Sequence, residues 1–190
     1  MRPSLHFGLW YLGLAAPTTQ TTPAESNCLR KFAEGRRQIV EIGVFQGVNT
    51  RNIREIMAED GCIYAVDPFP TGNLGVSLNQ YMAKNHVSSV SRGKVVWVKD
   101  ISPNAASPKW VPPEKEFDFI FVDGDHSYEA VRIDFDTWVP RLAQKAIMAF
   151  HDSYGRNNAG SERFVNEVVT NDNRFRLVER IDSLSVFEFS

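Results

Sequence analysis

The sequence predicts an α/β protein built on a doubly wound, mostly parallel sheet, and three observations indicate this class. Five short runs are almost continuously apolar, which is typical of strands buried on both faces of a parallel sheet. The segments between them are long enough for helical crossovers. Two further runs near the C-terminus lie too close together for a crossover and must pair antiparallel. The runs are Ile39–Gly43, Ile63–Val66, Val95–Val98, Phe117–Val122 and Ala146–Phe150, followed by Phe175–Arg180 and Leu184–Phe189.

Length and composition fit one globular domain with a short appendage. The chain has 190 residues, of which 43% are hydrophobic and 23% are charged, and this composition excludes a disordered or collagen-like chain. The formal net charge of −2 gives no general attraction to nucleic acid or to anionic membranes. Cys28 and Cys62 are too few for a disulfide framework. We therefore expect a reducing compartment, and a cytoplasmic protein is the simplest prediction.

The N-terminal part is expected to differ from the rest. Residues 1–22 are predicted to form a flap or extension, and residues 23–190 a single domain. The apolar stretch from Leu5 to Ala16 loosely resembles a signal peptide, but no small-residue cleavage site follows it. The stretch is also too short to span a bilayer. We expect a flap over an apolar pocket, and a targeting segment is the alternative.

Helices are predicted from capping signals and apolar spacing. Thr22 to Glu25 form a capping box with proline at the first helical position, and Gly35 ends that helix. Segment Pro70–Val90 is rich in Gly, Asn and Ser, so we expect a loop that shapes an acceptor pocket. Aromatic residues of the flap, Trp10 and Tyr11, would either line this pocket or pack on the sheet. Further helices are expected over Thr50–Glu59, Tyr128–Leu142 and Glu162–Asn171.

The last strand, Leu184–Phe189, carries apolar residues at both odd and even positions. A strand with one solvent-facing side would alternate, so this pattern predicts a strand inserted between two neighbours. A parallel sheet that closes with such a hairpin is a distinctive arrangement.

The first strand ends in a glycine turn that precedes a helix. Glu41 and Gly43 are followed by Gly47, a spacing of G-x-x-x-G. A glycine turn lets a ligand approach the backbone near the amide donors of the helix. The dinucleotide fingerprint G-x-G-x-x-G is absent from this turn, so the pattern favours a ligand without pyrophosphate. A plain strand-to-helix turn is the alternative.

Acidic residues follow the second and third strands. Asp67 stands where a carboxylate binds both hydroxyls of a ribose. Asp100 could accept a hydrogen bond from an adenine amino group, with Ile101 against the ring. The alternative for both acids is a local cap, since Pro68 follows the first and a short loop follows the second.

The fourth and fifth strands end in clusters of acids and histidines. Asp123 and His126 follow the fourth strand, and His151 and Asp152 follow the fifth. Ligands of open α/β sheets bind at these carboxyl ends, so the cluster indicates a site. The alternatives are helix caps for Asp125 and Ser127, and a satisfied buried pair for Asp123 and His151.

Taken together, these motifs resemble class I S-adenosylmethionine-dependent methyltransferases. The chain is most similar to the methyltransferase 24 branch, which is related to catechol and caffeoyl-CoA type O-methyltransferases. The resemblance covers Pro23 to Ser190 and implies a Rossmann-like, doubly wound seven-stranded sheet, mostly parallel with a C-terminal antiparallel hairpin.

The resemblance also implies roles for the residues named above. Asp123 would be both a cofactor-site acid and a metal ligand, and His126 and His151 would join it as catalytic residues. Histidines stand at two positions where metal-dependent members carry other residues: His126 replaces a lysine, and His151 an aspartate. The implied cofactor site is Glu41, Gly43 and Gly47 for the methionine part, Asp67 for the ribose, and Asp100 and Ile101 for the adenine; the implied metal ligands are Asp123, His151 and Asp152, for Mg²⁺ or Mn²⁺.

We therefore expect an enzyme that methylates the oxygen of a small hydroxylated molecule with S-adenosylmethionine, with a divalent metal as an optional helper. Expected partners are the small-molecule acceptor and a second copy in a homodimer, with neither nucleic acid nor membrane. The alternatives are an NAD-dependent oxidoreductase, a non-catalytic binding domain of the same fold, and a methyltransferase for nitrogen or a protein side chain.

Overall fold

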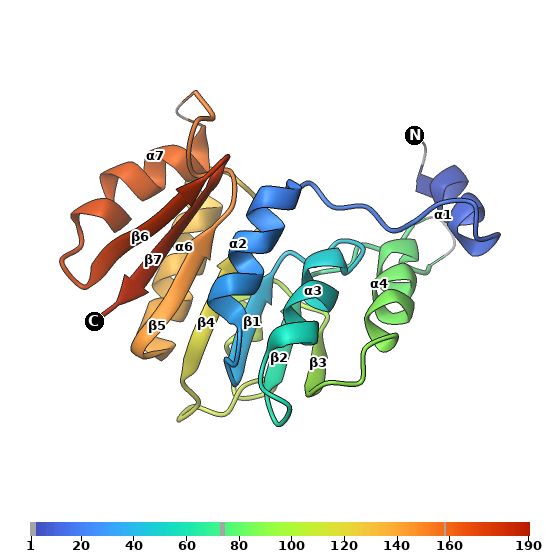
Figure 1. Cartoon of the computed structure of the whole chain (residues 1–190), viewed down its shortest axis with the longest axis horizontal. Helices are drawn as coiled ribbons and strands as arrows, with labels where there is room; N and C mark the ends of the chain where they lie inside the picture. The colour runs from blue at the N-terminus through green and yellow to red at the C-terminus, as the bar shows by residue number, and fades with distance from the viewer. Residues whose placement is uncertain (1–2, 73–74, 158) are drawn as a thin grey trace.

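The computed structural model describes residues 3–72, 75–157 and 159–190, and it contains one seven-stranded mixed sheet (Figure 1). The strand order is β3-β2-β1-β4-β5-β7-β6. Neighbouring strands are parallel, except that β7 runs antiparallel to both β5 and β6. This confirms the expected fold class, including the insertion of the last strand between two neighbours. The strands are β1 (Gln38–Ile42), β2 (Cys62–Val66), β3 (Lys94–Val98), β4 (Phe117–Val122), β5 (Leu142–Phe150), β6 (Phe175–Ile181) and β7 (Leu184–Phe189).

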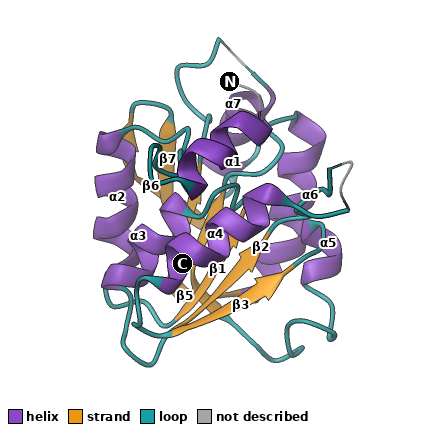
Figure 2. Cartoon of the chain, turned by 90° about the vertical axis from the view of Figure 1, so that its right-hand side faces the viewer, coloured by secondary structure: helices purple, strands orange, loops and turns teal. Residues whose placement is uncertain are grey.

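Helices cover both faces of the sheet (Figure 2). Leu29 of α2 and Ile53 of α3 belong to a buried cluster on one face, and Phe135 of α6 and Phe164 of α7 belong to the cluster on the other. Two apolar layers therefore fix the sheet from both sides and leave its carboxyl edge free for a site. The helices are α1 (Pro3–Tyr11), α2 (Pro23–Ala33), α3 (Val48–Ile56), α4 (Leu78–Ser88), α5 (Ser102–Ala105), α6 (Tyr128–Trp138) and α7 (Gly160–Glu167), with 3₁₀ turns at Val139–Arg141 and Val169–Asn171.

The predicted capping box at the start of α2 is present. The Glu25 amide donates to Thr22 Oγ1 (3.1 Å), and the Thr22 amide donates to Glu25 Oε2 (2.8 Å). The predicted helix Tyr128–Leu142 ends earlier, at Trp138, and continues as the 3₁₀ turn. Pro140 explains the early end because it has no amide to donate to the preceding turn.

The prediction of a loop over Pro70–Val90 is wrong for the part that α4 occupies, Leu78–Ser88. The side chain of Ser77 accepts from the Gln80 amide, and this cap starts a helix in a segment whose composition suggested none. Residues 73–74 of the expected loop lie outside the described residues.

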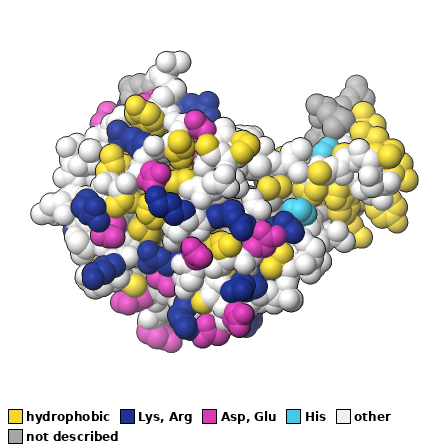
Figure 3. Space-filling view, viewed as in Figure 1, with side chains coloured by type: hydrophobic (Ala, Val, Ile, Leu, Met, Phe, Trp, Pro, Cys, Tyr) yellow, Lys and Arg dark blue, Asp and Glu magenta, His cyan; other side chains and the backbone are white. Residues whose placement is uncertain are grey.

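Helix α1 packs on α4 rather than on the sheet. The rings of Phe7 and Trp10 each lie 5.9 Å from the Tyr81 ring, while Tyr11 is 71% exposed. Trp10 thus packs on α4, and the expectation that Trp10 and Tyr11 line an acceptor pocket stays a prediction. Figure 3 shows apolar side chains gathered on this projecting N-terminal part. Within the described ranges, no helix is long and apolar enough to cross a membrane.

Candidate functional site

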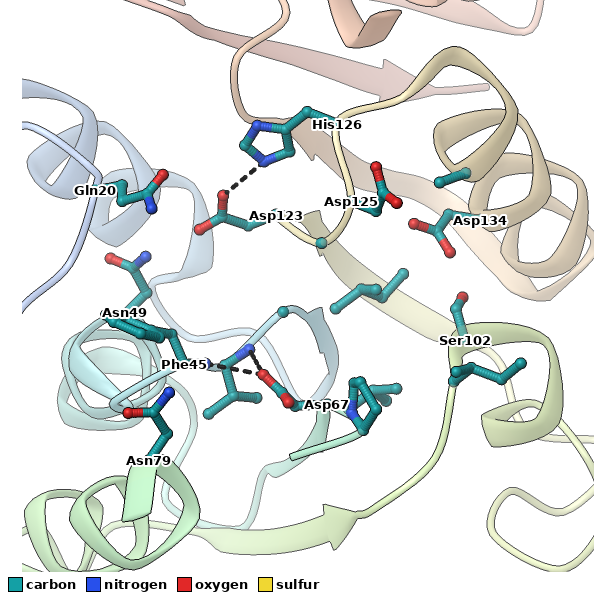
Figure 4. A pocket seen from close by; sticks show the side chains of 18 of the residues that line it. Gln20, Phe45, Asn49, Asp67, Asn79, Ser102, Asp123, Asp125, His126 and Asp134 are labelled. Carbon is teal, nitrogen blue, oxygen red and sulfur yellow. Dashed lines mark hydrogen bonds and ion pairs between the residues drawn. The ribbon is translucent and has the colours of Figure 1, made fainter. Parts of the chain in front are cut away.

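A cavity of about 590 Å³ opens at the carboxyl ends of the parallel strands (Figure 4). Six of the predicted site residues line it: Gly43, Asp67, Asp100, Ile101, Asp123 and His126. Four others, Glu41, Gly47, His151 and Asp152, lie outside the lining. Residues that sequence reasoning did not select also line the cavity, among them Thr18, Gln20, Asn49 and Asp134.

The glycine turn after β1 brings two strand ends into direct contact. Gly43 has φ +90°, and a Cβ placed there would lie 2.0 Å from the carbonyl oxygen of Asp123. Gly47 has φ +77° and precedes α3, where a Cβ would lie 3.0 Å from the Cα of Ala83. Only glycine fits these two positions without moving backbone. Gly43 allows this close approach of the Asp123 backbone, and its own backbone lines the cavity.

Asp67 anchors this turn as well as facing the cavity. Its Oδ2 accepts from the amides of Val44 and Phe45 (3.0 Å each), and its Oδ1 accepts from the Phe69 amide (2.6 Å). A carboxylate offers about four acceptor positions. The three amides leave about one of these for a ligand hydroxyl, so the local cap and the ligand contact expected from the sequence are compatible.

Glu41 lies completely buried beneath the cavity. Neither of its carboxylate oxygens has a hydrogen-bond partner among the described residues. Burial raises the pKa of Glu41 well above its ordinary value, the nearby Asp123 and Asp67 carboxylates add to this, and the Thr50 hydroxyl only partly offsets it. A buried carboxyl group without partners lowers the stability of the fold, and a ligand that contacts Glu41 would explain why it is present.

Asp100 acts mainly as a local cap. Its Oδ1 accepts from the Ile101 amide (3.0 Å) and from Asn104 Nδ2 (2.9 Å), and its Oδ2 faces the Trp110 indole nitrogen (3.4 Å). The hydrogen bond from Asn104 is the main reason that the pKa of Asp100 is lowered. These contacts fit the loop cap weighed as the alternative for Asp100, and they leave about one of its acceptor positions for a ligand.

Two histidines and two aspartates alternate beside the cavity. His126 Nδ1 lies 2.7 Å from Asp152 Oδ2, and its Nε2 lies 3.4 Å from Asp123 Oδ1. His151 Nδ1 lies 2.8 Å from the same Asp123 oxygen, while its Nε2 faces Glu25 Oε2 at 3.3 Å. His151 is fully buried, whereas His126 lines the cavity. The strand ends thus place Asp123 between two imidazole rings.

The carboxylates favour the protonated form of both rings. The Asp123 carboxylate raises the pKa of His126 against the opposing effect of burial. Burial lowers the pKa of His151, but Asp123, Asp152 and Glu25 together raise it more. Each ring is therefore held in place by charge on both sides.

Among the described residues, one group of ligand atoms could hold a metal ion, and it differs from the expected one. Asp123, His126 and His151 each offer an atom, and these atoms lie within 4.8 Å of one another. Asp152 is not in this group, although it was expected as the third ligand. Asp152 instead contacts His126 and the Arg156 Nε (2.6 Å).

A segment before α2 also borders the cavity and was only loosely expected as a flap. Gln46 Oε1 accepts from the Thr18 amide (2.8 Å) and lies 3.2 Å from His6 Nε2, so one amide side chain holds the segment against the glycine turn. No spacing signal predicts this contact. Asp134 was missed too, although it falls in the buried stripe Val131, Phe135 and Trp138 of α6, where an acid is unusual.

Solved structures of methyltransferases align with this chain, and they show that it has a methyltransferase fold. An O-methyltransferase from Bacillus cereus, solved in complex with SAH, aligns with TM-score 0.70 and 14% identity over 100% of this chain and 91% of that chain. NodS, an N-methyltransferase from Bradyrhizobium japonicum solved with S-adenosyl-L-homocysteine, aligns with TM-score 0.62 and 17% identity over 87% and 84%. An rRNA methylase from Streptococcus thermophilus aligns with TM-score 0.61 and 11% identity over 90% and 99%.

The chain belongs to the methyltransferase 24 family. The family model, described as a methyltransferase domain, matches residues 40–153, which run from within β1 to just past the end of β5. This confirms the resemblance seen in the sequence and the methyltransferase class. A curated relative, the uncharacterized protein y4gI of Sinorhizobium fredii, is 36% identical over 45 residues, which are 24% of this chain. The match spans only 5% of that relative's length.

Proposed function

We propose that this chain transfers a methyl group from S-adenosylmethionine to the oxygen of a small hydroxylated acceptor. The observation that carries the proposal is the meeting of Gly43, Asp67, Asp123 and His126 around one cavity at the sheet edge. The family supplies the reaction class, and methyl transfer replaces the nicotinamide chemistry weighed as an alternative. S-adenosylmethionine supplies a methyl group on a positively charged sulfur.

The residues present fit such a cofactor. Gly43 lines the cavity and presents only backbone to a ligand there, and the remaining acceptor position of Asp67 suits a ribose hydroxyl. Glu41, buried and without partners among the described residues, would receive the cationic methionine end, directly or through water. The acidic lining also suits a ligand with a sulfonium charge. Gly47 supports this end by starting α3 rather than by touching a ligand.

His126 is proposed as the base that takes the acceptor's proton. Asp152 faces its Nδ1 and would hold the hydrogen there, which leaves Nε2 on the Asp123 side to accept a proton. His151 is too buried to touch an acceptor, so it acts as a positioning residue that orients Asp123. Methyl transfer is an in-line displacement, so these residues would contribute mainly by aligning the acceptor oxygen with the methyl group.

A metal role is the second arrangement that the cluster supports. Asp123, His126 and His151 would be the ligands, and a divalent ion would lower the pKa of the acceptor hydroxyl. We favour the metal-free arrangement because Asp152, the third ligand expected from the resemblance, contacts His126 and Arg156 instead. His126 cannot serve as ligand and base at once, which makes the two arrangements distinguishable.

The acceptor class and the assembly are also proposals. The aligned O-methyltransferase favours an oxygen acceptor, while the aligned rRNA methylase and N-methyltransferase show that the fold alone does not fix the acceptor. The net charge of −2 argues against a polyanionic substrate. We propose a small molecule as acceptor and a homodimer as the assembly.

Calorimetry with S-adenosylhomocysteine tests the cofactor. Asp67→Ala should weaken binding by about 1–3 kcal/mol through the lost charged hydrogen bond. Asp118→Ala is the matched control, because Asp118 also accepts from two backbone amides, those of Arg37 and Gln38, outside the cavity lining. No heat with the wild-type protein at millimolar ligand would sink the proposal.

A screen of hydroxylated metabolites with tritiated methyl donor tests the base. His126→Ala should lower kcat by roughly 10²–10⁴-fold and leave S-adenosylhomocysteine affinity nearly unchanged. His86→Ala on α4 serves as a control, since His86 does not line the cavity. A chelator should have no effect on the wild-type rate, and a loss restored by Mn²⁺ would favour the metal arrangement. Intact turnover in His126→Ala without metal would remove the base role.

A further inference from the structure

Asp134 is a buried acid that faces the cavity and has no role in the proposed function. Asp134 is 5% exposed and belongs to the buried stripe of α6, yet it lines the cavity opposite the Asn49 side (Figure 4). Burying a carboxyl group in an apolar stripe costs free energy unless a hydrogen-bond partner or a ligand compensates for the lost water. Burial raises the pKa of Asp134 to about 6 and the nearby Asp125 adds to this, while the Ser102 hydroxyl lowers it.

The surroundings of Asp134 are suited to a flat, uncharged ring. Ile101 precedes α5 and is 53% exposed, and Ile133 on α6 is 40% exposed, although both line the cavity. Pro103 and Ala130 complete this apolar part of the lining. Exposed apolar side chains beside a single buried acid are the features expected of a pocket for a heteroaromatic base.

The position of Asp134 is also fixed rather than flexible. Trp138 Nε1 donates to Ser102 Oγ (2.8 Å), so the hydroxyl beside Asp134 is held by the next turn of α6. Gly124 leaves room on the cavity side, since a Cβ there would lie 3.8 Å from Asp134 Oδ2 and 3.5 Å from Ile42. The hydroxyl beside the Asp134 carboxyl group is thus held in place before a ligand binds.

Asp100, the acid expected to recognise adenine, is less available than Asp134. Three donors, from Ile101, Asn104 and Trp110, already occupy its carboxylate. The ionised carboxylate of Asp134 offers only acceptor oxygens, and the exocyclic N6 group of adenine is a donor.

We propose that Asp134, rather than Asp100, accepts the hydrogen bond from the adenine N6 amino group, and so selects a 6-amino over a 6-oxo purine in the cofactor. This inference rests on the proposed function, because it assigns the base-reading residue of the same cavity. A 6-oxo purine would place its oxygen against the Asp134 carboxylate, and two acceptors repel each other.

The test compares the affinities of S-adenosylhomocysteine and S-inosylhomocysteine, which differ at this purine position. The wild-type protein should prefer the adenosyl compound by about tenfold or more. Asp134→Ala should bring the ratio of the two affinities close to one. Asp134→Asn should also reduce the ratio, because the amide can donate to a 6-oxo group. Asp136→Asn is the matched control on α6, since Asp136 is solvent-exposed and pairs with Arg132.

The outcomes separate this inference from the proposed function. If the wild-type protein binds neither compound, the proposed function fails. If it binds S-adenosylhomocysteine and both Asp134 variants keep the wild-type ratio, Asp134 only supports Ser102 and the inference is overturned. The same holds if Asp100→Ala, and not an Asp134 variant, removes the preference. Should Asp134→Ala not fold, the nearly isosteric Asp134→Asn decides by the same ratio.

Discussion

Glu25 and Glu41 are both fully buried, yet their surroundings are opposite. Glu25 Oε1 accepts from the amide and the hydroxyl of Ser183 (2.8 and 2.6 Å), and its Oε2 accepts from the Thr22 amide and faces His151. Glu41 has no hydrogen-bond partner for either oxygen among the described residues, and its pKa is raised well above the usual range. The Glu25 carboxylate therefore has partners for both of its oxygens, whereas the Glu41 carboxyl group has none among the described residues.

The difference separates a carboxylate that serves the fold from one that serves the site. Glu25 joins the start of α2, the turn between β6 and β7, and the ring of His151, so three distant parts of the chain depend on it. Glu41 joins nothing and lies between the strand ends that carry Asp67 and Asp123. Buried polar groups are nearly always paired in folded proteins, and an unpaired one is most readily explained by a ligand.

The largest effect is expected when Glu25 is removed. Glu25→Ala leaves Ser183, Thr22 and His151 without their shared acceptor, and the free energy of unfolding should fall by about 3–5 kcal/mol. Chemical denaturation measures this, with Glu34→Ala as a control because Glu34 is exposed at the other end of α2. A loss below about 1 kcal/mol would show that Glu25 is no more structural than Glu41.

Glu41→Gln should act in the opposite direction on stability. The amide removes a buried ionisable group without partners, so the unfolding free energy without ligand should stay equal or rise. Affinity for S-adenosylhomocysteine should fall about tenfold, or about 1.4 kcal/mol, because a cationic methionine end favours the ionised carboxylate and an amide cannot take up that negative charge. Calorimetry and denaturation on one preparation measure both. Lower stability with unchanged affinity would reverse the assignment.

The pH dependence of stability sharpens the same comparison. The folded-state pKa of Glu41 lies well above 4.5, so between the two values the folded protein holds a proton that the unfolded chain has lost. Stability from this group is present below its unfolded pKa and is lost as pH rises through the folded pKa. Glu41→Gln should match the wild type near pH 4, to within about 1 kcal/mol, and gain on it progressively above. A constant difference between the two unfolding curves would contradict this.

The sequence predicts the part of the site that follows from strand order. Parallel strands bring their carboxyl ends to one edge, so the positions of Gly43, Asp67, Asp123 and His126 could be predicted from where each apolar run ends. The contact between Glu25 and Ser183 could not, because 158 residues separate them and only the closing hairpin brings them together. The orientation of Asp134 toward the cavity likewise depends on how α6 packs, which no local spacing determines.

The smallest expected effect is that of Thr50→Val near Glu41, and its counterpart beside Glu25 is Ser183→Ala. Ser183→Ala removes a charge-assisted donor from Glu25 and should lower the unfolding free energy by about 1.5–3 kcal/mol. Thr50→Val removes the buried hydroxyl near Glu41, which makes no hydrogen bond of normal geometry with the described residues, so the change should stay below about 1 kcal/mol. Denaturation of the two variants side by side measures the contrast. Equal losses would mean that the Thr50 hydroxyl does form a stabilising hydrogen bond with Glu41. Glu41 would then have a partner, and its burial would no longer indicate that it binds a ligand.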